Sequence, residues 1–124
     1  MMRILIVDDM QEYLSALTRA LSSEHEVVTA MSLKEAKEKM DSAIDIALVD
    51  IRLSEEDATN RDGILLLGWI KENFPNVPVV MMSAYRDFDA AVDALNLGAS
   101  RYLKKPINLR ELRHVLEELP KGNQ

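Results

Sequence analysis

Five polar or charged residues come directly after short runs that have the composition of β-strands. Asp8 and Asp9 follow residues 4–7, Asp50 follows 44–49, Ser83 follows 79–82, and Lys105 follows 101–104. In an open α/β sheet, ligands bind at the carboxyl ends of the strands, so we expect these residues to share one edge. Three carboxylates placed together repel one another, and a hard divalent cation relieves that repulsion. The set therefore predicts a site for Mg²⁺, or for Mn²⁺ in its place.

The same residue types could transfer a phosphoryl group to an aspartate. A carboxylate can attack phosphorus as a nucleophile and form an acyl phosphate. A lysine ammonium and a serine hydroxyl nearby would bind the remaining phosphoryl oxygens. Catalysis would then depend mostly on positioning and on neutralisation of charge.

Each of these residues, taken alone, has a simpler explanation. Asp8 and Asp9 could cap the helix that follows them, and Asp50 could be a turn residue. Ser83 alone is more simply a helix or turn cap, and Lys105 alone is more simply a solvated surface lysine. The functional interpretation depends on finding compatible chemistry at all of these strand ends together.

Apolar runs alternate with amphipathic stretches along the whole chain. Strands are predicted for residues 4–7, 26–30, 44–49, 79–82 and 101–104. Helices are predicted for residues 11–22, 33–40, 63–73, 87–97 and 109–119. Several of the strands are apolar on both faces, as a parallel sheet covered by helices requires. The alternation predicts five βα units in a doubly wound α/β fold.

Local signals predict the ends and faces of the helices. Capping boxes are expected at Asp9 with Glu12 and at Ser32 with Glu35, and a cap at Asn108 with Glu111. The helix over residues 87–97 is expected to end at Gly98 and to place three large residues in register, namely Phe88, Val92 and Leu95. The polar stretch 54–62 is expected to be a loop.

Composition excludes several classes of protein. The 124 residues are enough for one domain with a real core, which we place at residues 1–119, followed by a polar tail at 120–124. The chain has no cysteine, which rules out disulfide scaffolds and thiolate metal sites. Its formal net charge of −6 makes direct binding to nucleic acid a poor prospect. No apolar stretch reaches the length of a membrane helix, so the expected location is the cytoplasm.

The sequence resembles the receiver domain of response regulators in two-component signalling, the CheY-like family. The resemblance covers residues 3–119 and is specific because five motifs occur in order at family-like spacing. The motifs are Ile4-Leu5-Ile6-Val7-Asp8-Asp9, Leu48-Val49-Asp50-Ile51-Arg52, Val80-Met81-Met82-Ser83-Ala84, Ala94-Leu95 to Gly98-Ala99, and Tyr102-Leu103-Lys104-Lys105-Pro106. The family's fold is flavodoxin-like, with strand order 2-1-3-4-5.

The resemblance implies a role for each acidic residue of the site. Asp50 would be the phosphoacceptor and would receive its phosphoryl group from a histidine kinase or a histidine phosphotransfer protein. Asp8, Asp9 and Asp50 would hold Mg²⁺, with the backbone carbonyl of Arg52 as a further ligand.

The resemblance also implies roles for the remaining residues. Lys105, rather than Lys104, would contact the phosphoryl group, and the Lys105–Pro106 peptide would be cis. Ser83 would move to the phosphoryl oxygen, and Tyr102 would change rotamer with it. The surface formed by the fourth helix, fifth strand and fifth helix would then change shape and control an unknown output protein or domain.

The sequence departs from the family's pattern at two places. The stretch 54–62 is several residues longer than usual, which we interpret as a tolerated surface insertion rather than a gate for the kinase or the metal. The fifth strand begins with Ser100 and Arg101 instead of the paired acids of the winged-helix subfamily. A homodimer formed on phosphorylation is compatible with the family, but that subfamily's mode of dimerisation is not expected. The chain ends after its fifth helix, as a single-domain regulator or an excised receiver would.

Two residues are candidates for setting the phosphoryl lifetime. Arg52 lies two residues after Asp50, and Tyr85 lies two residues after Ser83, so both flank the path of a hydrolytic water. We predict that the bulky Tyr85 slows dephosphorylation.

Two other functions are compatible with part of this pattern. A small aspartate-nucleophile phosphohydrolase would use the same nucleophile, Mg²⁺ and lysine, but that family has a second acid where this chain has Arg52. A nucleotide-binding protein is disfavoured because the sequence has neither GxxxxGK nor GxGxxG. The predicted function is therefore a phosphorylatable signalling switch and not an enzyme with a separate substrate.

Overall fold

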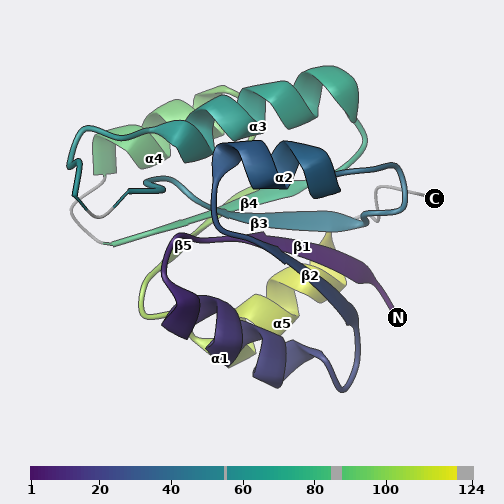
Figure 1. Cartoon of the computed structure of the whole chain (residues 1–124). Helices are drawn as coiled ribbons and strands as arrows, with labels where there is room; N and C mark the ends of the chain where they lie inside the picture. Colours follow the sequence, from purple (N-terminus) through teal and green to yellow (C-terminus); the bar gives the residue numbers. More distant parts are fainter. Residues whose placement is uncertain (55, 85–87, 120–124) are drawn as a thin grey trace.

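The computed structural model describes residues 1–54, 56–84 and 88–119, and it contains five strands and five helices in alternation (Figure 1). The strands are β1 (Arg3–Val7), β2 (Glu26–Ala30), β3 (Ile46–Asp50), β4 (Val79–Ser83) and β5 (Arg101–Lys104). The helices are α1 (Gln11–Leu21), α2 (Leu33–Lys39), α3 (Asp62–Asn73), α4 (Phe88–Asn96) and α5 (Leu109–Glu118). The predicted boundaries differ from these by at most two residues. The predicted tail, 120–124, lies outside the described residues.

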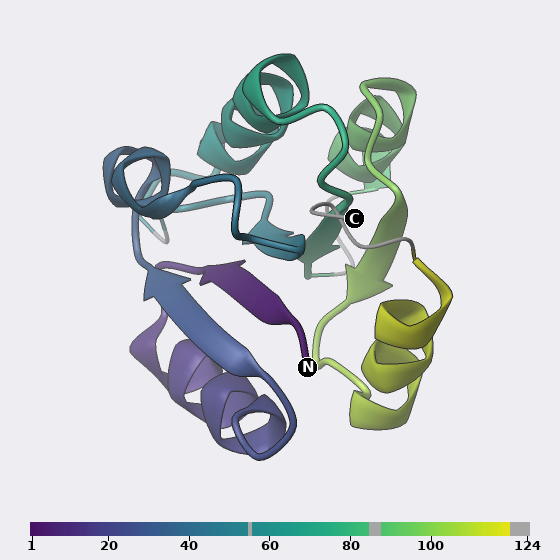
Figure 2. The ribbon, with the colours of Figure 1, turned by 90° about the vertical axis from the view of Figure 1, so that its right-hand side faces the viewer.

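The strands form one parallel sheet in the order β2-β1-β3-β4-β5, as predicted. Helices α1 and α5 cover one face, and α2, α3 and α4 cover the other (Figures 1 and 2). Strand β2 is added on one side of β1, and β3, β4 and β5 are added on the other, so the strand order reverses direction between β1 and β3. Such a reversal leaves a crevice where an α/β sheet binds its ligands.

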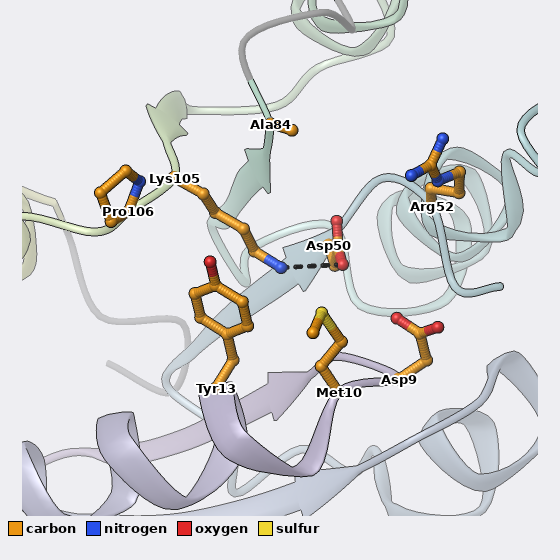
Figure 3. A pocket seen from close by; sticks show the side chains of 8 residues that line it. All are labelled: Asp9, Met10, Tyr13, Asp50, Arg52, Ala84, Lys105 and Pro106. Carbon is orange, nitrogen blue, oxygen red and sulfur yellow. Dashed lines mark hydrogen bonds and ion pairs between the residues drawn. The ribbon is translucent and has the colours of Figure 1, made fainter. Parts of the chain in front are cut away.

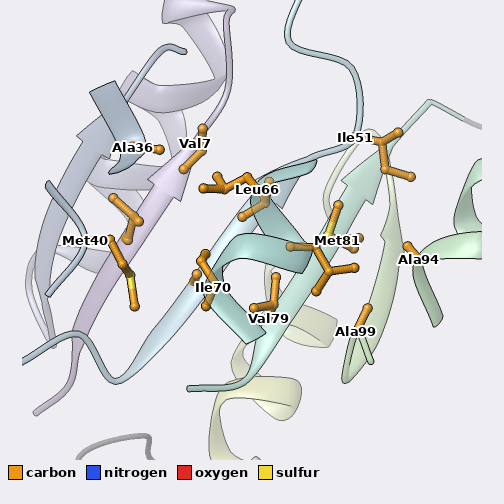
Figure 4. Close-up of a cluster of buried hydrophobic side chains, with 14 of the residues drawn as sticks. Val7, Ala36, Met40, Ile51, Leu66, Ile70, Val79, Met81, Ala94 and Ala99 are labelled. Atoms are coloured by element: carbon orange, nitrogen blue, oxygen red, sulfur yellow. The ribbon is translucent and has the colours of Figure 1, made fainter. Parts of the chain in front are cut away.

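Two hydrophobic clusters, one on each face of the sheet, hold the layers together. The larger cluster lies under α2, α3 and α4, and Figure 4 shows residues such as Leu66, Ile70 and Met81 within it. The smaller cluster packs α1 and α5 against the opposite face, with Leu14 and Leu112 among its members. Strands β3 and β4 are buried along their whole length. The residues at their carboxyl ends are therefore held by a rigid support.

The helix starts confirm two of the predicted caps and correct the third. Ser32 Oγ accepts from the Glu35 backbone N–H at 3.1 Å, and the same arrangement at Asn108 starts α5. The box predicted at Asp9 with Glu12 is wrong, because α1 begins after Met10 without a side-chain cap. Asp9 instead turns its carboxylate towards two other acids at the edge of the sheet.

Helix α4 buries small residues rather than the large ones that the sequence analysis put in register. Ala90, Ala91 and Ala94 face the sheet, while Val92 and Leu95 are 40% and 47% exposed. The alanines lie on a different side of the helix from the predicted stripe. The side chain of Phe88 lies outside the described residues. Gly98 ends this region with a φ of 104°, as predicted.

Candidate functional site

The carboxyl edge of the sheet brings together the residues that the sequence analysis selected. Asp8 follows β1, Asp50 ends β3, Ser83 ends β4, and Lys105 follows β5. Three of these polar residues are buried, with exposed fractions of 0% for Asp8, 7% for Asp50 and 1% for Ser83. Buried polar groups are costly unless they are partnered, so this cluster is a specific feature of the molecule.

Three carboxylates form the acidic part of the site. Asp8, Asp9 and Asp50 each offer an oxygen, and these oxygens all lie within 4.8 Å of one another. A hydrogen bond holds the Asp8 carboxylate in place, because its Oδ1 accepts from the Met10 backbone N–H at 2.9 Å. Hard oxygen donors converging on one point are the ligands that Mg²⁺ prefers, so the residues present fit such an ion.

Lys105 supplies the positive charge of the site. Its Nζ lies 2.6 Å from Asp8 Oδ2 and 3.0 Å from Asp50 Oδ2, and Figure 3 shows it reaching towards Asp50 from the far side of the pocket. The preceding Lys104 is exposed. The Lys105 backbone N–H donates to the Ser83 carbonyl at 2.8 Å, and the Lys105–Pro106 peptide is cis, as expected. The lysine before Pro106 is therefore the one that enters the site.

The electrostatics of the site reflect three acids facing one ammonium. Burial raises the pKa of Asp50 to about 7, and the neighbouring charge of Asp8 adds to this, although Lys105 opposes it. Burial acts to lower the pKa of Lys105, but the Asp50 and Asp8 carboxylates outweigh it and raise that pKa. Asp50 is therefore protonated more readily than an ordinary aspartate, and a bound cation would reverse this.

A hydrogen bond connects the site to β5. Ser83 Oγ lies 2.7 Å from the hydroxyl oxygen of Tyr102, and it also donates to the Ala84 carbonyl at 3.1 Å. Tyr102 is half-buried and packs against the larger hydrophobic cluster. The two residues proposed from the sequence as a switch are thus in direct contact.

An open pocket of about 210 Å³ lies over Asp50 (Figure 3). Its lining residues are Asp9, Met10, Tyr13, Asp50, Arg52, Ala84, Lys105 and Pro106. The sequence analysis missed Met10 and Tyr13. The signal that could have found them is their place at the start of α1, because the first turn of this helix rises from the same edge of the sheet as Asp8. The remaining candidate, Tyr85, lies outside the described residues.

Residues 54 and 56–61 form no regular strand or helix, whereas Asp62, which was predicted as part of the loop, is the first residue of α3. The end of this segment is anchored to the residues around the site. Asn60 Oδ1 accepts from the backbone N–H groups of Leu53 and Asp62, at 2.9 and 3.0 Å. Arg61 pairs with Asp93 of α4 at 2.8 Å. These contacts fix the start of α3 beside β3.

Comparison with known proteins assigns the chain to a family. Residues 4–117 match the family described as "Response regulator receiver domain". The chain is 38% identical over 117 residues to the transcriptional regulatory protein ZraR of Klebsiella oxytoca, covering 93% of this chain and 25% of that protein. It is 35% identical over 112 residues to the DNA-binding transcriptional regulator NtrC of Proteus hauseri, covering 90% of this chain and 23% of that protein. The chain thus spans about a quarter of the length of these relatives.

Solved structures give the same assignment. The receiver domain of NtrX from Brucella abortus matches with a TM-score of 0.81 and 34% identity, over 92% of this chain and 94% of that one. A CheY-like receiver domain protein from Methanospirillum hungatei matches with a TM-score of 0.84 and 31% identity, over 95% and 92%. Across the described part of the chain, no helix is both long enough and apolar enough to span a membrane. The motifs, the fold and the edge where they meet together show that this chain belongs to the response regulator receiver domains of two-component signalling.

Proposed function

We propose that Asp50 accepts a phosphoryl group and that the rest of the site prepares it to do so. The observation that carries the proposal is the position of Lys105, whose ammonium contacts both Asp50 and Asp8 at the base of an open pocket. Asp50 would attack the phosphorus of a donor, and the bond from phosphorus to the donor's leaving atom would break. The Lys105 ammonium and the Ser83 hydroxyl would then hold the phosphoryl oxygens.

The proposed metal ligands are Asp8, Asp9, Asp50 and the backbone carbonyl of Arg52. The close approach of the three carboxylates supports this set. A bound Mg²⁺ or Mn²⁺ would neutralise charge on the carboxylates and on the incoming phosphoryl group. Asp8 and Asp9 would hold the ion together with Asp50, while the Lys105 ammonium would remain beside Asp50.

The proposed switch runs from Ser83 to Tyr102 and then to the surface of α4, β5 and α5. The contact between the two hydroxyl groups supports this route. If Ser83 moves towards Asp50, either this hydrogen bond breaks or the Tyr102 side chain moves with Ser83. Exposed apolar side chains lie on the helices of this surface, among them Val92, Leu95 and Leu109. Such side chains are what a partner would cover.

The proposed partners are a histidine kinase or a histidine phosphotransfer protein as donor, and an output protein or domain as target. Relatives several times longer than this chain support an output outside it. The net negative charge supports the view that residues 1–119 do not bind nucleic acid themselves. A homodimer formed on phosphorylation is a further proposal, and the cytoplasm is the proposed location.

The experiment that tests the function is intact-mass measurement after incubation with acetyl phosphate and Mg²⁺. Wild type should gain one phosphoryl group, with a mass of about 80 Da. The gain should be absent without Mg²⁺ and absent in Asp50→Asn. No adduct on folded, Mg²⁺-bound protein would contradict the proposal, provided that no phosphate is released over time.

A further inference from the structure

Tyr13 makes a contact with Lys105 that neither the family assignment nor the acidic cluster explains. The Lys105 Nζ lies 4.0 Å from the centre of the Tyr13 ring, which is within the range of a cation–π interaction. Tyr13 comes from the first turn of α1 and Lys105 from the chain after β5, so the contact joins two segments that are far apart in the sequence and lie side by side at the pocket (Figure 3).

Hydrophobic packing does not account for the position of this ring. Within the described part of the chain, neither hydrophobic cluster takes in Tyr13, although each includes neighbouring residues of α1 or β5. The ring is half-buried and lines the pocket together with Met10 and Pro106. Its apolar face is directed at a charge rather than at the core.

The partners of Lys105 differ in whether another ligand would also bind them. Asp8 and Asp50 are also carboxylates that a metal ion would engage, and Asp50 is the one that would take the phosphoryl group. The ring face of Tyr13 has no use in either process. It is therefore a partner that Lys105 can keep while the two carboxylates change theirs.

We infer that Tyr13 is a positioning residue, which holds the Lys105 ammonium beside Asp50 through its ring face while the carboxylates engage other ligands. The inference rests on the proposed function, since it assigns Lys105 to the phosphoryl group. It adds a residue to the site and predicts that the ring, and not the hydroxyl, performs the task.

The test compares wild type with Tyr13→Phe and Tyr13→Leu in the full chain. The first variant keeps the ring, and the second keeps an apolar side chain of good helix propensity without a π face. Thermal unfolding shows whether all three proteins fold. Proton NMR then reports the ε-methylene protons of Lys105, assigned by their loss in Lys105→Ala, with and without Mg²⁺. The initial rate of phosphoryl incorporation from acetyl phosphate is measured by intact mass.

The ring should shift the Lys105 ε-methylene signals upfield in wild type and in Tyr13→Phe, in both the presence and the absence of Mg²⁺. The shift should disappear in Tyr13→Leu. Incorporation should be unchanged within about twofold in Tyr13→Phe and about threefold to tenfold slower in Tyr13→Leu. A structural role alone would change the unfolding temperature without separating these two variants by the lysine signal.

Several results would overturn the inference. They are an unshifted Lys105 signal in wild type, a shift that Mg²⁺ abolishes, a wild-type rate in Tyr13→Leu, or an equal loss of rate in both variants. Failure of the proposed function looks different. In that case wild type gains no phosphoryl group, and the Lys105 signal measured with Mg²⁺ still decides whether Tyr13 holds the lysine.

Discussion

The hydroxyl oxygens of Ser83 and Tyr102 lie 2.7 Å apart, and this hydrogen bond is a direct side-chain connection between the buried site and β5. We expect Tyr102→Phe to keep phosphoryl incorporation within about fivefold of wild type, because a hydrogen bond of this kind contributes about 1 kcal/mol. In the variant, however, phosphorylation of Asp50 should change the conformation of β5 and α5 less than in wild type. Backbone amide shifts in β5 and α5 on phosphorylation, measured by NMR, should be smaller than in wild type.

Ser83→Ala is the matched control, because it removes the hydroxyl proposed to contact the phosphoryl group. It should slow incorporation as well as reduce the amide shifts. Full-size amide shifts in Tyr102→Phe would contradict the proposed route from the site to the surface.

Gly63 is the residue whose size matters most to the position of Asp50. A Cβ at this position would lie 1.9 Å from the Asp50 carbonyl oxygen and 2.7 Å from the Ile51 Cα. Because backbone atoms cannot yield as a flexible side chain can, Gly63→Ala should lower the free energy of unfolding by about 3 kcal/mol or more. It should also lower the rate of phosphoryl incorporation. Chemical denaturation measures the first effect.

Gly68 provides the control on the same helix. A Cβ there meets nothing within 4 Å, so Gly68→Ala should raise the free energy of unfolding by about 0.5–1 kcal/mol. Equal effects of the two substitutions would show that helix propensity, and not the approach of α3 to β3, decides the outcome at Gly63.

The stability of the metal-free protein should depend on pH through Asp50. Burial first, and then the charge of Asp8, raise the pKa of this carboxyl from 3.8 to about 7, so the folded state binds its proton more tightly than the unfolded chain. The contribution of Asp50 to the free energy of unfolding therefore falls as pH rises between these values. Relative to wild type, Asp50→Asn should gain little at pH 4 and about 1–3 kcal/mol above pH 7.

Mg²⁺ should act in the opposite direction, because it binds the ionised carboxylates. Its stabilisation of wild type, measured as the shift in unfolding temperature, should grow from pH 5 to pH 8 and be much smaller in Asp50→Asn. A stability difference between the variants that does not change with pH would contradict the raised pKa.

The phosphoryl lifetime provides a fourth prediction. Tyr85→Ala should increase the rate at which phosphate is lost from Asp50, because a smaller side chain would open the path of the hydrolytic water. The loss of the phosphoryl mass is followed over time after the donor is removed. An unchanged rate would show that Tyr85 does not shield the acyl phosphate.

The sequence was informative where a single chain segment determines the outcome. Alternation of apolar runs predicted the parallel sheet, and the residues after each strand predicted the edge where Asp8, Asp50 and Lys105 meet. It failed where the start of a helix is shifted by one residue. Met10 occupies the N-cap position of α1, so Asp9 lies before the cap, and its carboxylate is placed with those of Asp8 and Asp50.

Two features depended on packing that no single segment encodes. Helix α4 packs its alanines against the core, so its larger residues Val92 and Leu95 face outward. Tyr13 was missed because its partner Lys105 lies far along the chain, and only the folded sheet brings the two together. The residue pattern of a single helix therefore predicts neither the buried face of α4 nor the contact between Tyr13 and Lys105.

The proposed function places the phosphoryl group on the carboxylate of Asp50. The most direct measurement is chemical trapping of the site. Protein treated with acetyl phosphate and Mg²⁺ is reduced with borohydride, which converts an aspartyl phosphate to homoserine, and the position is then read by tandem mass spectrometry. We predict homoserine at position 50 in wild type and none in Asp50→Asn. Homoserine at position 8 or 9, or a wild-type adduct that survives reduction unchanged, would contradict the account.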